Sequence, residues 1–343
     1  MSGGGPYNAL SPKEYFHLHG HDKFHSERGM PNVMNYEHLV KTLGKENAEK
    51  LNWGDTPSDT YGMHDYSMKS AQSCSTFNEL INKAFGKPKD AKEFSEWAQW
   101  INYNGYRAIF ESRSENRRGM LLWMSHPAWP SLVWQTYDYY LEPTAAYFGC
   151  KKACEPLHIQ WNSYREQIEV VNYHAGSRKN LVAKAEVIDQ QGKVKWQKET
   201  TLDIGEDQTA VCFPVEYPEK ISPMHLIKRT LKGGKTVSDN FYWRGTEDGN
   251  YKSLLEVPAG RVESQWAMAR EGNKWSIKGT IKNPTAVPAM MIRLKAVDES
   301  GEMILPVIYS DNYFFLMPGE SREIGISLTS ANRPSIAISG MNL

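Results

Sequence analysis

One carboxylate near the start of the sequence stands where a hydrolytic reaction could use it. Residues 23–27 form a short strand-like run that ends in Glu27, and Arg28-Gly29 turns the chain directly afterwards. A carboxylate at the C-terminal end of a barrel strand is where glycosidases hold the nucleophile that attacks the anomeric carbon. The pattern alone also fits a solvated or ion-paired glutamate, which is the usual role of this residue at the end of a strand.

Four histidines precede or adjoin this run. If residues 16–22 are extended, His17, His19 and His21 share one face, and His25 follows shortly after. Imidazole is a good zinc ligand, but no cysteine or carboxylate joins these histidines at a familiar spacing. We therefore predict no metal site here.

The four cysteines show no Cys-x-x-Cys or Cys/His zinc spacing. Cys150 and Cys154 are four residues apart, which on a helix places both on one face. Because helix geometry is poor for a disulfide, we predict two buried free thiols.

Helical periodicity dominates the first 154 residues. Apolar residues recur at helical spacing over residues 94–109, and Gly105 falls within that apolar stripe, where it allows a neighbour to approach closely. The apolar run 120–124 is too short for a helix and predicts a buried strand. A second aromatic helix is expected at about residues 131–141, closed by Pro143. Helix, buried strand and helix in this order indicate an α/β layer or barrel.

From residue 155 the pattern changes to short strands with turns every 8 to 12 residues. Gln191-Gly192 and Gly233-Gly234 are typical hairpin turns. Seven strands between residues 157 and 243 indicate an immunoglobulin-like sandwich, and residues 245–250 are expected to be a linker to a second one. The predicted divisions are residues 1–154, 155–245 and 246–343.

Composition excludes several classes of protein. The 343 residues carry 40 basic and 40 acidic side chains, so no positive surplus favours nucleic acid or an anionic membrane. No apolar run approaches the roughly 18 residues of a membrane span. The hydrophobic content of 40% is too high for a disordered chain. The aromatic content of 12% is compatible with binding of flat, weakly polar ligands such as sugars, and also with large cores.

Several motifs in order along the chain resemble glycoside hydrolase family 2. Residues 24–31 (FHSERGMP) are similar to the family's nucleophile segment, and Tyr36-Glu37 follows as it does there. Further similarities occur at residues 97–99, 106–111, 119–124, 129–134, 146–158 and 309–320. The branch that is most similar contains exo-β-D-glucosaminidases and β-mannosidase-like enzymes. The resemblance implies the C-terminal part of a (β/α)8 TIM barrel followed by two immunoglobulin-like β-sandwiches.

The same resemblance implies roles for individual residues. Glu27 would be the nucleophile at the end of barrel strand 7, and Trp123, at the end of strand 8, would form the floor beneath the sugar. Trp129, His64 and Asp65 would lie in loops around the pocket. A core role for Trp123, a packing role for Trp129 and a surface position for His64 and Asp65 remain open. No metal and no cofactor are implied.

The chain departs from the family pattern in one respect. The family's acid/base comes from an Asn-Glu pair that precedes the nucleophile, whereas the pair Asn78-Glu79 follows Glu27. We therefore expect a C-terminal portion of a retaining exo-acting β-glycosidase, inactive alone, whose acid/base belongs to a missing N-terminal half or a complementing chain.

Two alternatives remain at this stage. The sandwiches could form a non-catalytic carbohydrate-binding or interaction module, or the chain could be one half of a split glycosidase. The expected partner is a carbohydrate substrate, without nucleic acid or membrane. The sequence does not assign a compartment, although the family resemblance favours the periplasm or the exterior of the cell.

Overall fold

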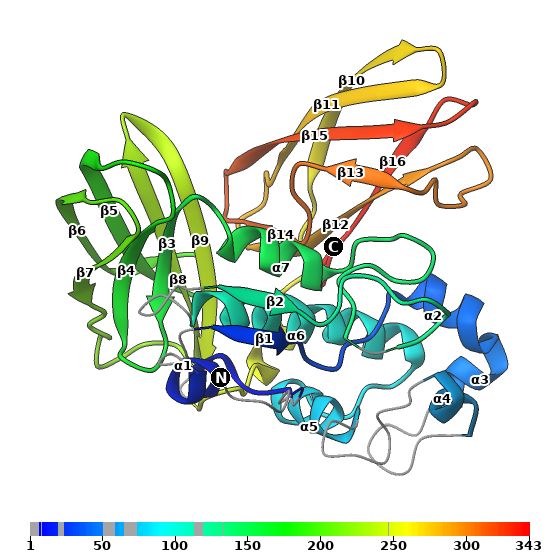
Figure 1. Ribbon diagram of the computed structural model, residues 1–343, viewed down its shortest axis with the longest axis horizontal. Helices are drawn as coiled ribbons and strands as arrows, with labels where there is room; N and C mark the ends of the chain where they lie inside the picture. Colours follow the sequence, from blue (N-terminus) through cyan, green and yellow to red (C-terminus); the bar gives the residue numbers. More distant parts are fainter. Residues whose placement is uncertain are drawn as a thin grey trace.

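The computed structural model describes residues 7, 9–19, 24–50, 59–64, 74–112, 119–132, 134–245 and 247–343. A helical region packs against two β-sandwiches, one formed by β3–β9 and the other by β10–β16 (Figure 1). No helix in these described ranges is both long and apolar enough to cross a membrane.

The helical region contains seven helices and two short strands among its described residues. In chain order they are α1 (Pro12–His19), β1 (His25–Arg28), α2 (Tyr36–Leu43), α3 (Lys45–Glu49), α4 (Asp59–His64), α5 (Cys74–Ala84), α6 (Ala91–Glu111), β2 (Met120–Leu122) and α7 (Ala145–Ala153).

The strands β1 and β2 pair in parallel, and α6 lies beside them (Figure 1). His25 is opposite Met120 and Arg28 is opposite Leu122. The predicted strand at 120–124 is confirmed over residues 120–122 as β2, but the expectation that it is buried is wrong, because Leu121 is 58% exposed. No third strand joins this sheet in the part of the chain that the structure describes.

Helix α6 begins and packs as its sequence requires. The Asp90 side chain accepts a hydrogen bond from the Glu93 N–H at 2.8 Å, which caps the helix. A Cβ on Gly105 would lie 2.2 Å from the Met30 sulfur, which confirms the expected close approach at this glycine. A Cβ on Gly149 of α7 would lie 2.4 Å from the Tyr103 carbonyl oxygen, so this glycine lets α7 pack directly against α6.

The predicted helix at residues 131–141 does not form. The described residues of this segment make turns, with an isolated bridge between Tyr137 and Pro143. The Asp138 carboxylate accepts hydrogen bonds from the backbone N–H groups of Tyr140 and Glu142, both at 2.9 Å. An aspartate that binds nearby backbone donors in this way competes with helix formation. The helix begins only at Ala145.

The first sandwich confirms the seven predicted strands. They are β3 (Leu157–Asn162), β4 (Gln167–Asn172), β5 (Arg178–Asp189), β6 (Val194–Ile204), β7 (Gln208–Pro214), β8 (Met224–Gly233) and β9 (Lys235–Gly245). One sheet has the order β3-β4-β7 and the other β6-β5-β8-β9. Gly192 and Gly234 adopt positive φ angles of 80° and 81° in the predicted hairpin turns.

The second sandwich follows a 3₁₀ helix, η2 (Lys252–Glu256). Its strands are β10 (Glu263–Glu271), β11 (Lys274–Lys282), β12 (Ala289–Val297), β13 (Val307–Tyr309), β14 (Phe314–Leu316), β15 (Ser321–Thr329) and β16 (Ser335–Ser339). The sheets have the orders β10-β11-β15-β13 and β14-β12-β16.

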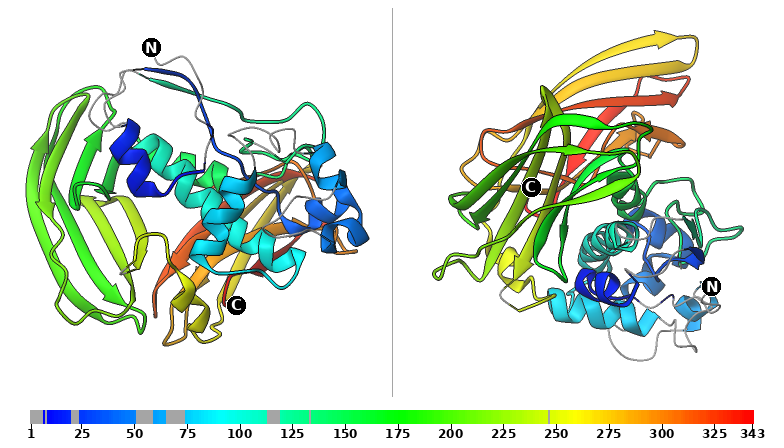
Figure 2. Two further views of the ribbon diagram at one scale, coloured as in Figure 1. Left: turned by 90° about the horizontal axis from the view of Figure 1, so that it is seen from below. Right: turned by 60° about the vertical axis from the view of Figure 1, so that its left-hand side comes forward.

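The helical region and the second sandwich share one apolar core, which also includes Phe241 and Trp243 of β9, and Figure 2 shows both sandwiches beside the helices. Phe315 of β14 lies with its ring centroid 5.7 Å from that of Trp100 on α6 and 4.2 Å from that of Phe241 on β9. The interior of the first sandwich is a separate apolar cluster. Helix α6 therefore connects the parts of the molecule through direct aromatic packing.

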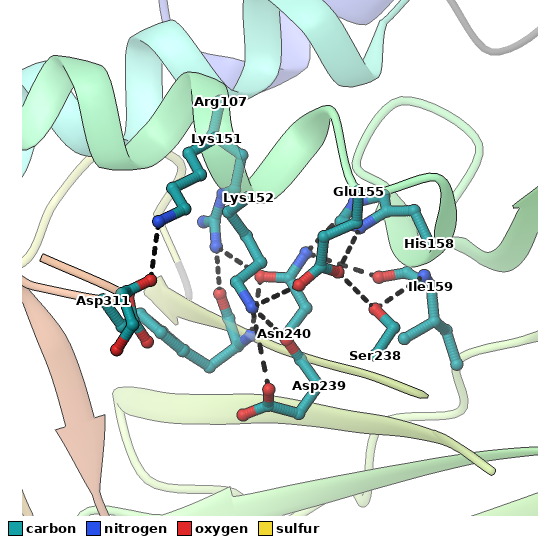
Figure 3. Close-up of polar contacts among 12 residues, drawn as sticks. Arg107, Lys151, Lys152, Glu155, His158, Ile159, Ser238, Asp239, Asn240 and Asp311 are labelled. Carbon is teal, nitrogen blue, oxygen red and sulfur yellow. Dashed lines mark hydrogen bonds and ion pairs between the residues drawn. The ribbon is translucent and has the colours of Figure 1, made fainter. Parts of the chain in front are cut away.

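Polar contacts hold α6 and α7 against the first sandwich (Figure 3). Arg107 of α6 donates a hydrogen bond to the Asn240 side-chain oxygen at 2.8 Å. Lys152 of α7 donates to Glu155 at 2.7 Å and to the carbonyl oxygen of Asp239 at 3.0 Å. These side chains fix the helices that flank β1 and β2.

The cysteines are free where the structure describes their side chains. Cys150 is half-buried on α7, and Cys154, which follows this helix, is exposed. The prediction of free thiols is confirmed, whereas the burial predicted for Cys154 is wrong, because this residue is the C-terminal cap of α7 and not part of its packed face. Cys212 is also free and half-buried.

Candidate active site

Glu27 lies in β1, one residue before its C-terminal end, and its side chain is half-buried. The Tyr7 hydroxyl donates a hydrogen bond to the Glu27 carboxylate oxygen Oε2. A hydrogen bond from a hydroxyl orients the carboxylate that accepts it. The hydrogen bond from Tyr7 thus fixes the orientation of the Glu27 carboxylate near the end of β1.

Trp123 follows β2 directly, at the same end of the parallel pair. Its N–H donates to the Arg28 carbonyl oxygen at 2.8 Å, and its side chain is 40% exposed. A Cβ on Gly29 would lie only 1.9 Å from the Trp123 carbonyl oxygen. Glycine at position 29 therefore allows the two strand ends to lie together, which places the Glu27 and Trp123 segments side by side.

Trp129 and His64 lie in contact, although 65 residues separate them. Their rings stack with centroids 5.6 Å apart and planes inclined by 23°. His64 Nδ1 donates to the Pro130 carbonyl oxygen at 2.6 Å, and the Leu132 N–H donates to the His64 carbonyl oxygen at 2.9 Å. The loop that follows β2 is thereby attached to the end of α4. Trp129 is 45% exposed, and Asp65 lies outside the described residues.

Two residues of this region were not found from the sequence. Tyr7 is 20 residues from Glu27 and belongs to no motif or periodic pattern, so only the fold brings it to the carboxylate. Gly29 was noted as part of a turn, although its packing against Trp123 depends on the pairing of β1 with β2. A glycine after a strand-end carboxylate is a signal that could have indicated a close backbone contact.

The histidines do not form the face that an extended segment would give them. Residues 12–19 are helical, so the premise of an extended run from residue 16 is wrong. His17 is exposed and its ring lies 4.6 Å from that of Tyr164. His25 is buried in β1, with Nδ1 at 2.9 Å from the Glu27 carbonyl oxygen. His21 lies outside the described residues, as does the side chain of His19.

One buried group has the residue types of a metal site. His38 of α2 contacts Asp138 through Nδ1, and the same nitrogen lies 3.2 Å from Oε2 of Glu142. Arg293 of β12 donates to the other Glu142 oxygen at 2.5 Å. A protonated His38 and Arg293 offset the charges of the two carboxylates, so these residues form a charge network between α2, the 138–142 loop and the second sandwich.

This network predicts a pH-dependent stability. Burial opposes protonation of His38, but Asp138 and Glu142 more than offset it and raise the pKa of His38 from 6.5 to about 9. A group whose pKa is higher in the folded than in the unfolded state stabilises the folded state. This contribution is fully present below the unfolded pKa of 6.5. We expect this contribution, on the order of 3 kcal/mol, to be lost as the pH rises from about 6.5 to about 9.

Urea unfolding followed across this pH range would measure the effect. His38→Gln should remove most of the dependence between these pH values. The Tyr140 ring lies 4.6 Å from the His38 ring, and Lys41 lies over the Tyr140 ring; both contacts should be little disturbed by the substitution. An unchanged pH profile in His38→Gln would show that another group titrates, for example His158, whose pKa is also raised by its two glutamate partners despite burial.

Comparisons with known proteins show what this chain is similar to. A family model described as the exo-β-D-glucosaminidase Ig-fold domain matches residues 240–343. An exo-β-D-glucosaminidase of Amycolatopsis orientalis is 28% identical over 388 aligned residues, which cover 100% of this chain and 37% of that protein. The solved structure of an exo-chitosanase from the same organism, in complex with PNP-β-D-glucosamine, superposes with a TM-score of 0.90 and 25% identity, over 98% of this chain and 44% of the other.

This chain is related to the C-terminal portion of glycoside hydrolase family 2 enzymes. A mannosylglycoprotein endo-β-mannosidase of Lilium longiflorum is also similar, with 24% identity over 98% of this chain and 44% of that protein. The chain thus spans well under half the length of these family 2 relatives. The resemblance inferred from the motifs is confirmed, and the immunoglobulin-like part is supported directly by the matching family model.

Proposed function

We propose that this chain forms the nucleophile-bearing side of the active site of a retaining, exo-acting β-glycosidase that acts on β-glucosaminides or β-mannosides. The observation that carries this proposal is the parallel pairing of β1 with β2, which brings the Glu27 and Trp123 segments together at one end of the sheet. On this proposal β1 and β2 are the last two strands of a (β/α)8 barrel, within residues 1–154, and the sandwiches occupy residues 155–245 and 246–343.

The chemistry follows from the groups at that end. The Glu27 carboxylate attacks the anomeric carbon and forms a covalent glycosyl-enzyme while the bond to the leaving oxygen breaks. A carboxylic acid on the opposite side of the bond protonates the leaving oxygen and later takes a proton from the water that releases the sugar. Two inversions at the same carbon return the original β configuration.

Other residues of this chain would prepare the attack. The Tyr7 hydroxyl, which donates to Glu27, would keep one carboxylate oxygen engaged and direct the other toward the sugar. The exposed indole of Trp123 offers an apolar face to the C–H groups of a pyranose ring. Trp129 and His64 would line one wall through their stacked rings. Asp65, adjacent to His64 in sequence, would contribute to the same wall.

The acid/base and the remaining strands would come from a segment outside residues 1–343. Glu79 does not match the acid/base position of the family, because it lies exposed on helix α5 and not at the end of a strand that precedes the nucleophile. Retaining glycosidases need their two carboxyl groups about 5–5.5 Å apart. A two-stranded sheet also leaves open edges that further barrel strands would pair with.

The test is reconstitution. The chain alone should not hydrolyse aryl β-D-glucosaminides or β-D-mannosides. Combined with the segment that precedes the aligned region in the Amycolatopsis orientalis exo-β-D-glucosaminidase, joined to it or co-expressed with it, the chain should gain activity and release a β-configured product. Turnover by the chain alone would contradict the missing acid/base, and a stable reconstituted enzyme without activity would contradict the proposed function.

A further inference from the structure

The Tyr7 ring, whose hydroxyl donates to Glu27, packs against a second aromatic residue. The centroid of the Trp134 ring lies 4.7 Å from that of Tyr7, and the two ring planes are inclined by 36°. Both residues are buried, and they form a small apolar cluster of their own. Aromatic pairs at this separation attract each other beyond what their buried area contributes. Trp134 therefore helps to fix the ring that carries the hydrogen-bond donor to Glu27.

The backbone of Trp134 is tied to the segment that carries Trp123. The Trp134 carbonyl oxygen accepts a hydrogen bond of 2.5 Å from the N–H of Met124, the residue after Trp123. Trp134 also has a φ of 60°, a value that residues other than glycine rarely adopt. A bulky residue keeps such a conformation only where the surrounding contacts determine it, and such positions are common at active sites. One residue thus contacts both the donor to the proposed nucleophile and the segment of the proposed sugar floor.

The next residue, Gln135, attaches the same loop to the segment after β1. The Gln135 N–H donates to Asn32 Oδ1 at 3.4 Å, and Asn32 Nδ2 donates to the Gln135 carbonyl oxygen. Both residues are buried. Because a buried polar group that loses its partner is costly, these hydrogen bonds oppose movement of the loop. The backbone at residues 134 and 135 is therefore fixed relative to the segments that follow both β1 and β2.

We infer that Trp134 is a positioning residue for Glu27 and that it acts through Tyr7. The fixed indole holds the Tyr7 ring, and the Tyr7 hydroxyl holds one oxygen of the Glu27 carboxylate, so that the other oxygen is directed toward the anomeric carbon. Trp134 needs no contact with the sugar for this role. The inference rests on the proposed function, because it concerns how the nucleophile is oriented for attack. It adds a buried residue of the loop after β2 to the groups that prepare this step.

A double-mutant cycle in the reconstituted enzyme tests this inference. Tyr7→Phe should lower kcat for an aryl β-glycoside about 10- to 100-fold, as expected when a hydrogen bond to a charged group is lost. The KM should change less than about threefold, because the lost interaction acts in the transition state. Trp134→Leu should lower kcat about tenfold, and Trp134→Phe should lower it less, since a ring still packs against Tyr7. In the Tyr7→Phe background, Trp134→Leu should cause little further loss, because the hydroxyl that it positions is already absent.

The matched control is Trp161→Leu, which removes a buried tryptophan of β3 from the interior of the first sandwich. This substitution should lower the unfolding midpoint, but it should leave kcat unchanged in both the wild-type and the Tyr7→Phe enzyme. A general loss of stability would therefore be recognised by its effect on both tryptophan variants. If the losses of kcat from Trp134→Leu and Tyr7→Phe multiply fully in the double variant, Trp134 does not act through Tyr7 and the inference is wrong.

A measurement on the chain alone separates this inference from the proposed function. In a sample labelled with ¹³C at the ε carbons of tyrosine, the Tyr7 signal is assigned from its loss in Tyr7→Phe. Glu27→Gln should shift this signal, because the acceptor of the Tyr7 hydroxyl changes, and the shift should be much smaller when Trp134→Leu is also present. Equal shifts in both backgrounds would overturn the inference even if the reconstituted enzyme is active. If the reconstituted wild type is inactive, the proposed function fails, and this measurement still decides whether Trp134 holds Tyr7 at Glu27.

Discussion

Glu27→Ala in the reconstituted enzyme should lower turnover of an aryl β-glycoside by on the order of 10⁴-fold or more, as expected when an enzyme loses its nucleophile. Azide should then restore reaction in a diagnostic way. The anion enters the space left by the carboxylate, attacks the anomeric carbon and displaces the aryl group, while the acid/base protonates the leaving oxygen. Because only one inversion occurs, the product should be an α-glycosyl azide, which NMR identifies.

The matched control is Glu79→Ala, which removes an exposed glutamate from α5. This variant should keep the activity of the reconstituted enzyme, since Glu79 is exposed on α5 and does not belong to β1 or to the loop after β2. Loss of activity in Glu27→Ala without azide rescue would leave a structural defect as the explanation, so the variant must also match the wild type in its unfolding midpoint. An active Glu27→Ala enzyme would contradict the assignment of the nucleophile.

Glu111→Ala should destabilise the chain by about 3–5 kcal/mol, the range observed when one partner of a buried ion pair is removed. Glu111 is fully buried at the end of α6, and its Oε1 accepts from His158 Nε2 at 2.9 Å and from Asn240 Nδ2 at 3.0 Å. The Tyr242 hydroxyl donates to the same oxygen. Burial raises the pKa of Glu111, but His158 and Arg107 more than offset this and lower it below its usual value.

The alanine variant would leave several buried donors without their acceptor, His158 among them. Glu111→Gln should cost less, because an amide oxygen still accepts from Asn240 and Tyr242. Glu216→Ala serves as the control, since its ion pair with Lys198 at 3.2 Å is largely exposed and should be worth less than about 1 kcal/mol. Urea unfolding followed by tryptophan fluorescence measures all three. Equal stability of Glu111→Ala and the control would show that the packing of α6 against the first sandwich does not depend on this carboxylate.

Local sequence patterns correctly predicted much of the fold. Alternation and turn residues placed all seven strands of the first sandwich, and helical spacing placed α6 together with the close approach at Gly105. The helix prediction for residues 131–141 was wrong. Their aromatic spacing suggested a helix, but the Asp138 carboxylate binds backbone N–H groups that a helix would need. The prediction that His17, His19 and His21 share one face of an extended segment was wrong, because residues 12–19 are helical.

Residues of the candidate site could be predicted from the sequence only where they belong to a recognisable motif. Glu27 and Trp123 belong to segments with family similarity, and the structure brings these segments together. Tyr7 and the His38 network depend on contacts between distant segments. Arg293, for example, reaches Glu37 and Glu142 from 256 and 151 residues away. Such pairs leave no signal in spacing, because each partner alone is an ordinary charged residue.

The aromatic contacts of Phe315 with Trp100 and Phe241 limit which parts of the chain a gene rearrangement can separate. A gene rearrangement that removed the second sandwich would uncover Trp100 on α6 and Phe241 on β9, and the exposed apolar surface would favour aggregation. The region matched by the family model, residues 240–343, begins within β9 and therefore carries Phe241 together with Phe315. The α6 side of the contact would still be lost. Recombination is therefore expected to keep the helices and both sandwiches together as one heritable unit.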